Sequence, residues 1–389
     1  MKILFVVNNF FAVGNGLSAS ARRTVAKLKE MGHDVRVISG PNHVEGGPQP
    51  DYQLKDLHIP IVQPIIDANG YMYAQPDPKL MEEAASWADV VHLEEPFTLE
   101  IKMIKICERI GKPMTATYHL HPENITFAFG PLLYWKGLNR AHLRLWRKVV
   151  FNHVQCVQCP TENVMDRLRR YHFKPVLKLI SNGLVLEDSI RPATPPANFE
   201  DPERPIKVLC IGRLSVEKDQ FTLLDAMKYS VNAHRIQLQF AGQGLAEEKI
   251  KRKAHKMYKD GILKYEPEFY FLDKQGLKEI SAQADMAIHC AFIEVEGLSI
   301  MEAIQQGAMP IIAEGRTTGT SQFALARRNI FPVKNPESLA HRIDYWLRHP
   351  QERWESGLKH AESIKQYDIN KSCEKLVRMF QLAIDNYKK

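Results

Sequence analysis

Short apolar runs alternate with longer amphipathic stretches along most of the chain. The first such unit is an apolar strand at residues 3–7, a loop at 8–16, a helix over about 18–31 and a second apolar strand at 35–38. The helix repeats its apolar positions every three to four residues, whereas the strands are unbroken apolar runs, as in a sheet covered on both faces. Repetition of this unit predicts an α/β fold built from doubly wound parallel sheets.

One break in composition divides this pattern. Residues 191–205, RPATPPANFEDPERP, are rich in proline, as segments that connect domains often are. A chain of 389 residues suits two domains of ordinary size. We therefore expect a first domain at residues 1–187, a linker at 188–205 and a second domain at 206–369. Strands expected in the first domain after residue 40 are 59–65, 90–93, 114–118, 154–159 and 176–181.

Composition narrows the class of protein. Hydrophobic residues make up 44% and charged residues 25%, which is typical of a globular protein. No apolar run reaches the roughly 18 residues that span a bilayer, and Asn8 and Asn9 break the first run, so we expect neither a transmembrane helix nor a secretory signal. The net charge of +7 favours an anionic partner without choosing among nucleic acid, membrane and phosphate-bearing substrates.

The cysteines are scattered through the expected strands and helices. This usage is typical of a protein in the reducing cytosol. Cys156 and Cys159 have the spacing of a zinc site with His153 nearby, but no fourth ligand is evident. We expect structural cysteines and no metal site. The six cysteines are at positions 107, 156, 159, 210, 290 and 373.

Residues 284–315 carry the most suggestive chemistry. A short strand leads to a loop with Glu294 and Gly297 and then to a helix from about residue 299, whose first N–H groups can meet an anion. Glu302 lies one turn inside this helix. Doubly wound sheets bind ligands where strands end and helices begin, so both carboxylates can face phosphate or sugar hydroxyls. The alternative is that Glu302 only favours the helix dipole and Glu294 is a solvated loop residue.

Three other segments have chemistry suited to a diphosphate. After the strand expected at residues 207–211, Arg213 and Lys218 lie five positions apart and can converge on one diphosphate, although a basic loop is usually only solvated. Glycines within residues 14–16 and 242–244 let the backbone approach a ligand closely.

Histidines and acids follow two strands of the first half. His119 and His121 come after the strand expected at residues 114–118, and His92 and Glu94 end another strand. Such histidines can orient a phosphate or sugar hydroxyl, or act as general acid or base. Single histidines are more often structural, so the residues alone leave both roles open.

Residues 131–150 predict a basic amphipathic helix without an acidic side chain. Trp135 is expected on the same face as Trp146, eleven residues later. This pattern is that of a helix that lies on an anionic membrane surface, or of a packed helix with a solvated basic face. The basic stripe consists of Lys136, Arg140, Arg144 and Arg147, and the apolar stripe of Leu138, His142, Leu145, Trp146 and Val149.

The loop and helix around Glu294 resemble a signature of the group 1 retaining glycosyltransferases (glycosyltransferase family 4), E-x7-E followed by A-x3-G-x-P-[VI]-I. The resemblance implies the GT-B fold, with two Rossmann-like doubly wound domains facing a cleft and a last helix, residues 370–389, that packs back on the first domain. It also implies a nucleotide-sugar donor whose sugar meets Glu294 and whose ribose meets Glu302. The residues in register are Glu294, Gly297, Leu298, Glu302, Ala303, Gly307, Pro310 and Ile312.

Other segments extend the resemblance. GRLSVEK is similar to the family motif GRL-x-x-EK, whose Arg and Lys hold the donor pyrophosphate and offset leaving-group charge. In the family, Gly244 would belong to a turn near the nucleotide, Gly16 to a loop that closes over the diphosphate and acceptor, and His119 would face the donor sugar. The residues of the GRL-x-x-EK motif are Gly212, Arg213 and Lys218 here.

The segments HLEEPFTLE and TYHLHPE resemble HxHxPF and TYHT of the subgroup that glycosylates diacylglycerol or related lipids. The chain departs from the family at three positions. Glu94 replaces the second His of HxHxPF, Val185 stands where Asp is usual, and Asp273 stands where Gly is usual near the base.

These features predict a retaining hexosyltransferase that moves a hexose from UDP-glucose or UDP-galactose to a membrane lipid such as diacylglycerol or ceramide, forming an α-glycoside. The reacting centre would use His119, Glu294, Arg213 and Lys218 without a metal ion or a cofactor besides the donor. The protein would lie on the cytoplasmic face of an anionic membrane through residues 131–150, and nucleic acid is not an expected partner.

Three alternatives remain open from the sequence. The first is a soluble or polysaccharide acceptor, and the second is a nucleotide-sugar epimerase of the same fold. The third, a non-catalytic binder, is disfavoured because Glu294, Glu302, Arg213 and Lys218 are all present. The oligomeric state stays open.

Overall fold

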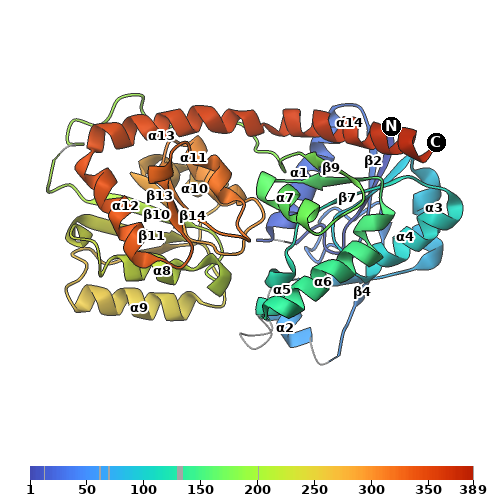
Figure 1. Cartoon of the computed structure of the whole chain (residues 1–389), viewed down its shortest axis with the longest axis horizontal. Coiled ribbons are helices and arrows are strands. Elements are labelled where there is room, and N and C mark those ends of the chain that lie inside the picture. Colours follow the sequence, from blue (N-terminus) through green and yellow to red (C-terminus); the bar gives the residue numbers. More distant parts are fainter. Residues whose placement is uncertain (13, 61–62, 69–70, 129–134, 200, 389) are drawn as a thin grey trace. The chain divides into compact units, whose positions relative to one another are not determined.

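The computed structural model describes residues 1–12, 14–60, 63–68, 71–128, 135–199 and 201–388. The chain divides into two compact units, Met1–Gly183 with Ile369–Lys389 and Leu184–Asp368 (Figure 1). We call them the first and the second domain. The proline-rich stretch that was expected as a linker belongs to the second domain.

A parallel sheet forms the centre of the first domain. Its strands, among the described residues, run in the order β3-β2-β1-β6-β7-β8-β9. Ile3 of β1 lies opposite Val35 of β2 on one side and Val90 of β6 on the other. The strands are β1 (Lys2–Val6), β2 (Asp34–Ser39), β3 (Tyr52–Gln53), β6 (Val90–Leu93), β7 (Met114–Thr117), β8 (Cys156–Cys159) and β9 (Val176–Leu179), and a separate antiparallel pair is β4 (Lys55–Leu57) and β5 (Tyr73–Gln75).

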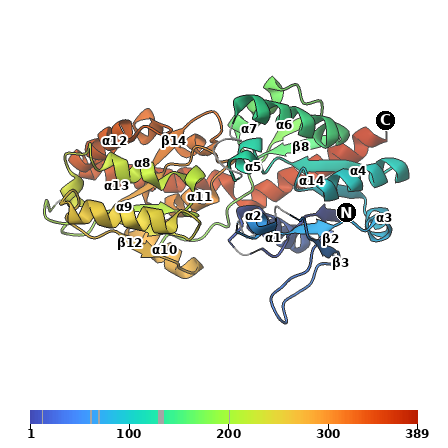
Figure 2. The same cartoon turned by 90° about the horizontal axis from the view of Figure 1, so that it is seen from below.

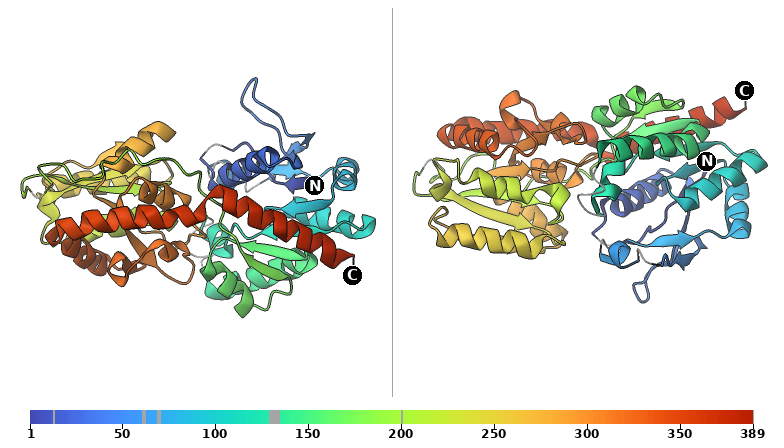
Figure 3. Two further views of the ribbon diagram at one scale, coloured as in Figure 1. Left: turned by 90° about the horizontal axis from the view of Figure 1, so that it is seen from above. Right: turned by 60° about the horizontal axis from the view of Figure 1, so that its bottom comes forward.

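Helices cover both faces of this sheet. They are α1 (Gly16–Glu30), α2 (Gln63–Ala68), α3 (Pro78–Trp87), α4 (Thr98–Ile110), α5 (Pro122–Ala128), α6 (Lys136–Val149), α7 (Glu162–Arg170) and α14 (Ile369–Tyr387). Because successive strand residues point to opposite faces, Ile3 and Phe5 pack against α1 and α14, which lie side by side (Figure 3). Leu4 and Val6 are buried on the other face, where α3 contacts both β1 and α4.

The second domain repeats this architecture in its own sheet. Among the described residues its parallel strands run in the order β12-β11-β10-β13-β14-β15. In β10, Val208 and Leu209 point to opposite faces, and each belongs to a separate core cluster. The strands are β10 (Ile206–Ile211), β11 (Ile236–Ala241), β12 (Glu268–Tyr270), β13 (Met286–His289), β14 (Met309–Glu314) and β15 (Ile330–Pro332).

Six helices pack on this sheet within the described part of the domain. They are α8 (Gln220–Ala226), α9 (Glu247–Lys259), α10 (Lys274–Gln283), α11 (Leu298–Gln305), α12 (Pro336–Arg348) and α13 (Pro350–Ile364). The buried side chains of α8, α9 and α12 share one core cluster, and those of α10, α11 and α13 share the other. α8 and α9 lie on one side of the strands and α10 and α11 on the other (Figure 1, Figure 2).

Most expected elements are present, but residues 59–65 are not a strand. Within the described part of that range, α2 begins at Gln63 with Pro64 in its first turn. Proline suits the first turn of a helix because its missing N–H has no intrahelical partner there. Residues 61–62 lie outside the described part. The short helices α8 and α10 were not expected from the apolar pattern.

All six cysteines are buried, and none of them forms a disulfide. Cys156 and Cys159 lie three positions apart in β8 and therefore point to opposite faces of the strand, so they do not form one site. Among the described residues, no group of three or more His, Cys, Asp or Glu is arranged to hold a metal ion. In the same part of the chain, no helix has the length and apolar character needed to cross a membrane.

Candidate functional site

The strand order reverses once in each sheet, and polar loops gather at both reversals. In the second domain β10 lies between β11 and β13. A crevice forms at such a reversal, outside the carboxyl ends of the strands, and doubly wound sheets bind ligands there. Gly212 directly follows β10, and residues 290–297 follow β13. The site residues expected in the second half of the chain therefore share one edge of the sheet.

Two glycine turns pack tightly against neighbouring backbone at this edge. A Cβ atom on Gly242 would lie 2.1 Å from the carbonyl oxygen of Gly212, and Gly242 has a φ of 146°, which side chains rarely adopt. A Cβ atom on Gly244 would lie 2.4 Å from the carbonyl oxygen of Leu214. Packing of the protein itself therefore requires glycine at these two positions.

Glu294 is held by two basic side chains. Its Oε2 atom forms an ion pair with Nζ of Lys218, and Nε2 of His289 lies 3.4 Å from the same oxygen. The side chains of Glu294 and His289 are only 16% and 4% exposed. Burial alone would raise the pKa of Glu294, but Lys218 and His289 hold this pKa well below its usual range. Glu294 is therefore a stable anion at the edge of the sheet.

The backbone of Glu294 is fixed by the segment after β14. Its N–H donates to the carbonyl oxygen of Thr317 at 2.8 Å, and its own carbonyl oxygen accepts from the N–H of Gly319 at 2.9 Å. Gly297, the N-cap of α11, has a φ of 80°, and a Cβ atom there would lie 2.4 Å from Cγ2 of Thr320. The carboxylate thus projects from a well-supported loop.

Arg213 and Lys218 do not share a partner in this structure. The Arg213 side chain is 49% exposed and pairs with Glu217 at 3.1 Å, whereas Lys218 pairs with Glu294. The two cations that were expected to converge on a diphosphate are therefore each neutralised by a different glutamate.

The N-terminus of α11 lies beside the end of β10. Leu298 is the first residue of the helix, and the hydroxyl of Ser299 donates to the carbonyl oxygen of Ile211 at 3.2 Å. Glu302 follows one turn later and is partly buried. Expected donor-binding residues from two loops and one helix thus gather at this edge.

In the first domain the reversal places Asn8 after β1 and Glu95 after β6, with β1 between β2 and β6. The Asn8 N–H and side-chain amide both donate to Oε2 of Glu95 at 2.8 Å, and the amide donates to Oε1 of Glu100 at 3.0 Å. The hydroxyl of Tyr71 also donates to Glu95. Burial raises the pKa of Glu95, and burial together with Glu95 raises the pKa of Glu100 well above its usual value. The two buried carboxyl groups therefore share surroundings that disfavour the ionisation of both at once.

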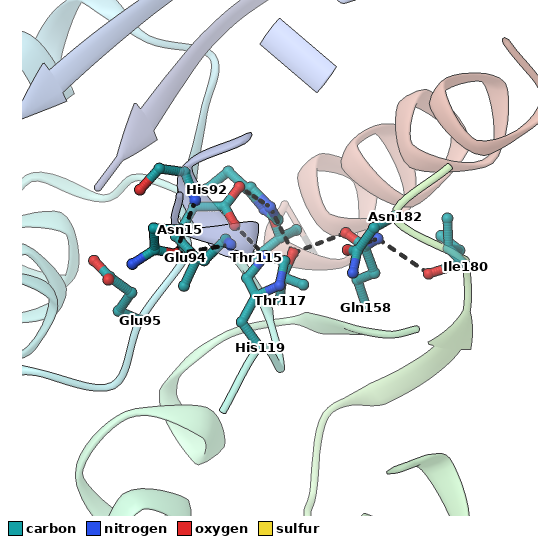
Figure 4. Close-up of polar contacts among 12 residues, drawn as sticks. Asn15, His92, Glu94, Glu95, Thr115, Thr117, His119, Gln158, Ile180 and Asn182 are labelled. Carbon is teal, nitrogen blue, oxygen red and sulfur yellow. Dashed lines mark hydrogen bonds and ion pairs between the residues drawn. The ribbon is translucent and has the colours of Figure 1, made fainter. Parts of the chain in front are cut away.

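His119 joins the same edge through Glu94. Its Nε2 atom is bonded to Oε2 of Glu94, and the two side chains are 6% and 3% exposed (Figure 4). Burial alone would raise the pKa of Glu94, but His119 and His92 hold it at about 2. The histidine expected to face the donor sugar is therefore paired with a buried carboxylate.

A neighbouring cluster fixes the segment that carries His119. Arg167 of α7 donates to both carboxylate oxygens of Glu123, at 2.6 and 2.9 Å, and its Nη1 lies 3.1 Å from Nδ1 of His121. The hydroxyl of Tyr118 lies 3.2 Å from the same nitrogen. His121 is thus a buried structural residue.

Gly16 begins α1, and protein atoms already cap this helix end. Oδ1 of Asn15 accepts from the N–H groups of Leu17 and Ser18, at 2.9 and 3.4 Å. A Cβ atom on Gly16 would meet nothing within 4 Å, so packing does not require the glycine. A ligand contact at Gly16 stays a prediction.

The solvent-facing side of α6 combines basic and apolar residues. Trp135 and Leu145 are 69% and 52% exposed, whereas Trp146 is 3% exposed. The expectation that both tryptophans share one face is wrong, because Trp135 is the N-cap, has extended backbone and lies outside the helical repeat. Arg147 is half-buried and donates to the carbonyl oxygen of Tyr171 at 2.6 Å. Residues 131–134 of the expected membrane-binding surface lie outside the described part. The exposed basic residues of α6 are Lys136, Arg140, Arg144 and Lys148.

Sequence reasoning missed Asn8, Glu100 and His289 as parts of these sites. Asn8 ends the apolar run of β1, which is a local signal, whereas His289 lies inside the apolar run of residues 286–293 and has no such signal. Asp273, which stands where the resembling family has glycine, accepts from the N–H of Gly276 at 2.8 Å and caps α10.

Comparison with known proteins decides the family. Residues 14–188 match the model described as Glycosyltransferase Family 4, and residues 195–368 match Glycosyl transferases group 1. The chain is a group 1 glycosyltransferase. Alpha-monoglucosyldiacylglycerol synthase of Streptococcus pneumoniae (strain ATCC BAA-255 / R6) is 23% identical to this glycosyltransferase over 330 residues, which are 81% of this chain and 71% of the relative.

Solved structures show the same architecture. HepE of Anabaena in complex with UDP-glucose has a TM-score of 0.73 at 16% identity, covering 98% of this chain and 99% of HepE. Sucrose-phosphate synthase of Thermosynechococcus elongatus has a TM-score of 0.71 at 15% identity, covering 98% of each chain. The glycosyltransferase therefore has the GT-B fold, as expected from its sequence.

The ion pair of Lys218 and Glu294 should be strongly coupled in this glycosyltransferase. Lys218→Met leaves a carboxylate without its main partner, so a double-mutant cycle with Glu294→Gln, followed by urea unfolding, should give a coupling of about 1–3 kcal/mol. The exposed pair Lys256 and Asp260, 2.8 Å apart, is the matched control and should give a much smaller coupling. Equal coupling in both pairs would contradict this account of the site.

The buried acid pair predicts how stability depends on pH. A carboxyl group with a raised pKa in the folded state contributes stability below its ordinary pKa, and this contribution is lost as pH rises through the folded value. Glu100→Gln mimics the protonated acid, so the variant should lose less free energy of unfolding than the wild type between pH 5 and pH 8. The raised pKa of Glu100 fixes the sign of this difference, and urea unfolding at several pH values measures it. Glu83→Gln, an exposed change on α3, should leave the pH dependence as in the wild type.

Proposed function

We propose that this glycosyltransferase is retaining and moves a hexose from UDP-glucose or UDP-galactose to a membrane lipid such as diacylglycerol or ceramide, forming an α-glycoside. The observation that carries the donor half is the anionic Glu294 next to Lys218 at the edge of the second sheet. Hydrogen bonds from sugar hydroxyls to a fixed carboxylate orient a hexose, and a cation beside it suits the attached diphosphate.

Charge complementarity supports a nucleotide-sugar donor. A diphosphate offers Lys218 and Arg213 stronger anionic partners than their present glutamates, and the N–H groups at the start of α11 favour the same charge. Lys218 and Arg213 would offset the charge of the leaving group. Glu302 would hold the ribose. The backbone at Gly16 and Gly244 would lie close to the diphosphate. The likeness to HepE solved with UDP-glucose supports a UDP-linked donor. His119 would meet the sugar at the reacting centre.

A lipid acceptor is supported by two independent observations. The Streptococcus pneumoniae relative is named alpha-monoglucosyldiacylglycerol synthase. The exposed side of α6 carries basic residues next to Trp135, Leu138 and Leu145, which are 69%, 37% and 52% exposed. Interfacial aromatic and aliphatic side chains next to lysine and arginine favour an anionic membrane surface. We therefore place the enzyme peripherally on the cytoplasmic face of a membrane.

The experiment that tests this function is a donor and acceptor panel. UDP- and GDP-sugars are incubated with mixed vesicles that contain diacylglycerol or ceramide, and both nucleotide release and glycolipid formation are measured. We expect one UDP-sugar to give an α-linked glycolipid, and Glu294→Ala to reduce turnover by at least about 100-fold because the sugar loses its orienting carboxylate.

The other outcomes separate the remaining functions. Transfer that does not need vesicles would support a soluble or polysaccharide acceptor. Interconversion of UDP-sugars without any acceptor would support an epimerase, and the absence of turnover with every donor would support a binder.

The exposed basic side of α6 should control membrane binding. Charge reversal at Arg140, Arg144 and Lys148 removes three cations, each worth about 1 kcal/mol near an anionic surface, so binding to phosphatidylserine-containing vesicles should weaken at least about 100-fold in sedimentation. The matched control reverses Lys249, Arg252 and Lys259, exposed residues of the basic helix α9. It makes the same change in net charge and should weaken binding far less. Equal losses would mean that net charge, and not α6, drives binding.

A further inference from the structure

Glu94 is a buried carboxylate that the resembling motif does not contain. It replaces the second His of HxHxPF and is 3% exposed. A buried carboxylate is costly unless cationic or hydrogen-bonding groups surround it. Oε2 of Glu94 is bonded to Nε2 of His119, and Oε1 lies 3.5 Å from Nε2 of His92 (Figure 4). Two imidazoles therefore meet one carboxylate.

The ring of His92 is fixed in position. Phe5 and Phe380 pack edge-on against it, with ring centroids 4.9 and 5.2 Å away. Its Nδ1 lies 2.8 Å from Oγ1 of Thr115, and its Nε2 lies 2.9 Å from Oγ1 of Thr117. His92 thus forms a rigid support beneath Glu94.

A backbone carbonyl sets the direction of this hydrogen-bonded chain. Nε2 of Gln158 donates to the carbonyl oxygen of Ile180 at 3.0 Å, which orients the amide and leaves its Oε1 as an acceptor. The hydroxyl of Thr117 donates to that oxygen at 2.8 Å. Because a hydroxyl has one proton to donate, Thr117 must accept from Nε2 of His92. The Nε2–H group of His92 also faces Glu94. A carboxylate that faces an N–H donor is favoured in its ionised form, which only accepts hydrogen bonds.

The ionised state of Glu94 determines which nitrogen of His119 carries a proton. A carboxylate only accepts hydrogen bonds, so the Nε2 atom of His119 must donate. Among the described residues, no hydrogen-bond partner is assigned to Nδ1 of His119. His119 and His92 lower the pKa of Glu94 to about 2, which agrees with an ionised carboxylate.

We propose that Glu94 is a positioning residue that keeps a proton on Nε2 of His119 and presents Nδ1 of that ring to the substrate. The proposal rests on the proposed function, in which His119 faces the donor sugar. In the neutral ring, Nδ1 then carries a lone pair that can accept a hydrogen bond from a sugar hydroxyl. Glu94 would therefore select the orientation of the hexose without touching it.

The test is the protonation pattern of His119, read by long-range ¹H–¹⁵N correlation on protein with ¹⁵N-labelled histidine rings. His119→Asn assigns the signals, and spectra are taken from pH 6 to pH 9 to reach the neutral ring. We expect the neutral wild-type ring to keep its proton on Nε2. Glu94→Gln should populate the form with the proton on Nδ1, because the new amide can donate to Nε2.

The matched control is the exposed pair of His153 and Glu108, in which Nδ1 lies 2.7 Å from the carboxylate. Glu108→Gln should change neither the His119 signals nor turnover. A wild-type His119 with its proton on Nδ1, or an unchanged pattern in Glu94→Gln, would overturn the proposal. If Glu94→Gln does not fold, the wild-type spectrum still tests the proposal, because it shows whether Nε2 or Nδ1 of the neutral His119 ring carries the proton.

Kinetics distinguish positioning from packing. We expect Glu94→Gln to lower kcat by about 10- to 100-fold, the size of effect seen when the carboxylate that orients a metal-bound histidine is lost, with a much smaller change in the affinity for UDP alone. The spectra need no substrate. If the protein transfers no sugar but His119 keeps its proton on Nε2, the proposed function is wrong and the role of Glu94 stands. If the enzyme is active but His119 carries its proton on Nδ1, only the role of Glu94 is wrong.

Discussion

The reversal of strand order in each parallel sheet is the constraint on which the rest of the structure depends. At the reversal, the chain leaves two neighbouring strands toward opposite faces of the sheet, so the two loops diverge and do not cover the strand ends. These loops follow β1 and β6 in the first domain and β10 and β13 in the second. Backbone and side-chain polar groups remain available at these points while the apolar strands are buried on both faces. Both candidate sites therefore occupy equivalent places in their domains, although the two domains share no obvious sequence repeat.

Both edges solve the same electrostatic problem in the same way. Each places a glutamate after the strand beyond the reversal, Glu94 after β6 and Glu294 after β13, in a poorly solvated position. Burial alone would raise the pKa of each carboxylate, but a histidine of the preceding strand and a basic side chain of another loop keep it ionised. A fixed anion with a fixed hydrogen-bond donor beside it can orient sugar hydroxyls, and at the second edge the ammonium group of Lys218 can also offset phosphate charge.

The fold could be predicted from the sequence because its signal is local. Unbroken apolar runs and helical repeats mark most strands and helices, and the strand expected at residues 90–93 agrees with β6. The failures have physical causes: Pro64 opens a helix where an apolar run suggested a strand, and Trp135 is an N-cap outside the helical repeat. Motif spacing found Glu294 and Lys218 but not their pairing, because 76 positions separate them and only the parallel sheet brings them together. The bond of Glu94 to His119 was hidden for the same reason.

In the proposed donor complex, Lys218 exchanges Glu294 for the donor diphosphate, which leaves the carboxylate for the sugar. A crystal structure of the enzyme with bound UDP-glucose would show whether this exchange takes place. We expect Nζ of Lys218 within hydrogen-bond distance of a phosphate oxygen and the Glu294 carboxylate within hydrogen-bond distance of the sugar hydroxyls. UDP should lie at the reversal of strand order between β10 and β13. A complex in which Lys218 stays on Glu294 while UDP binds away from that edge would contradict it.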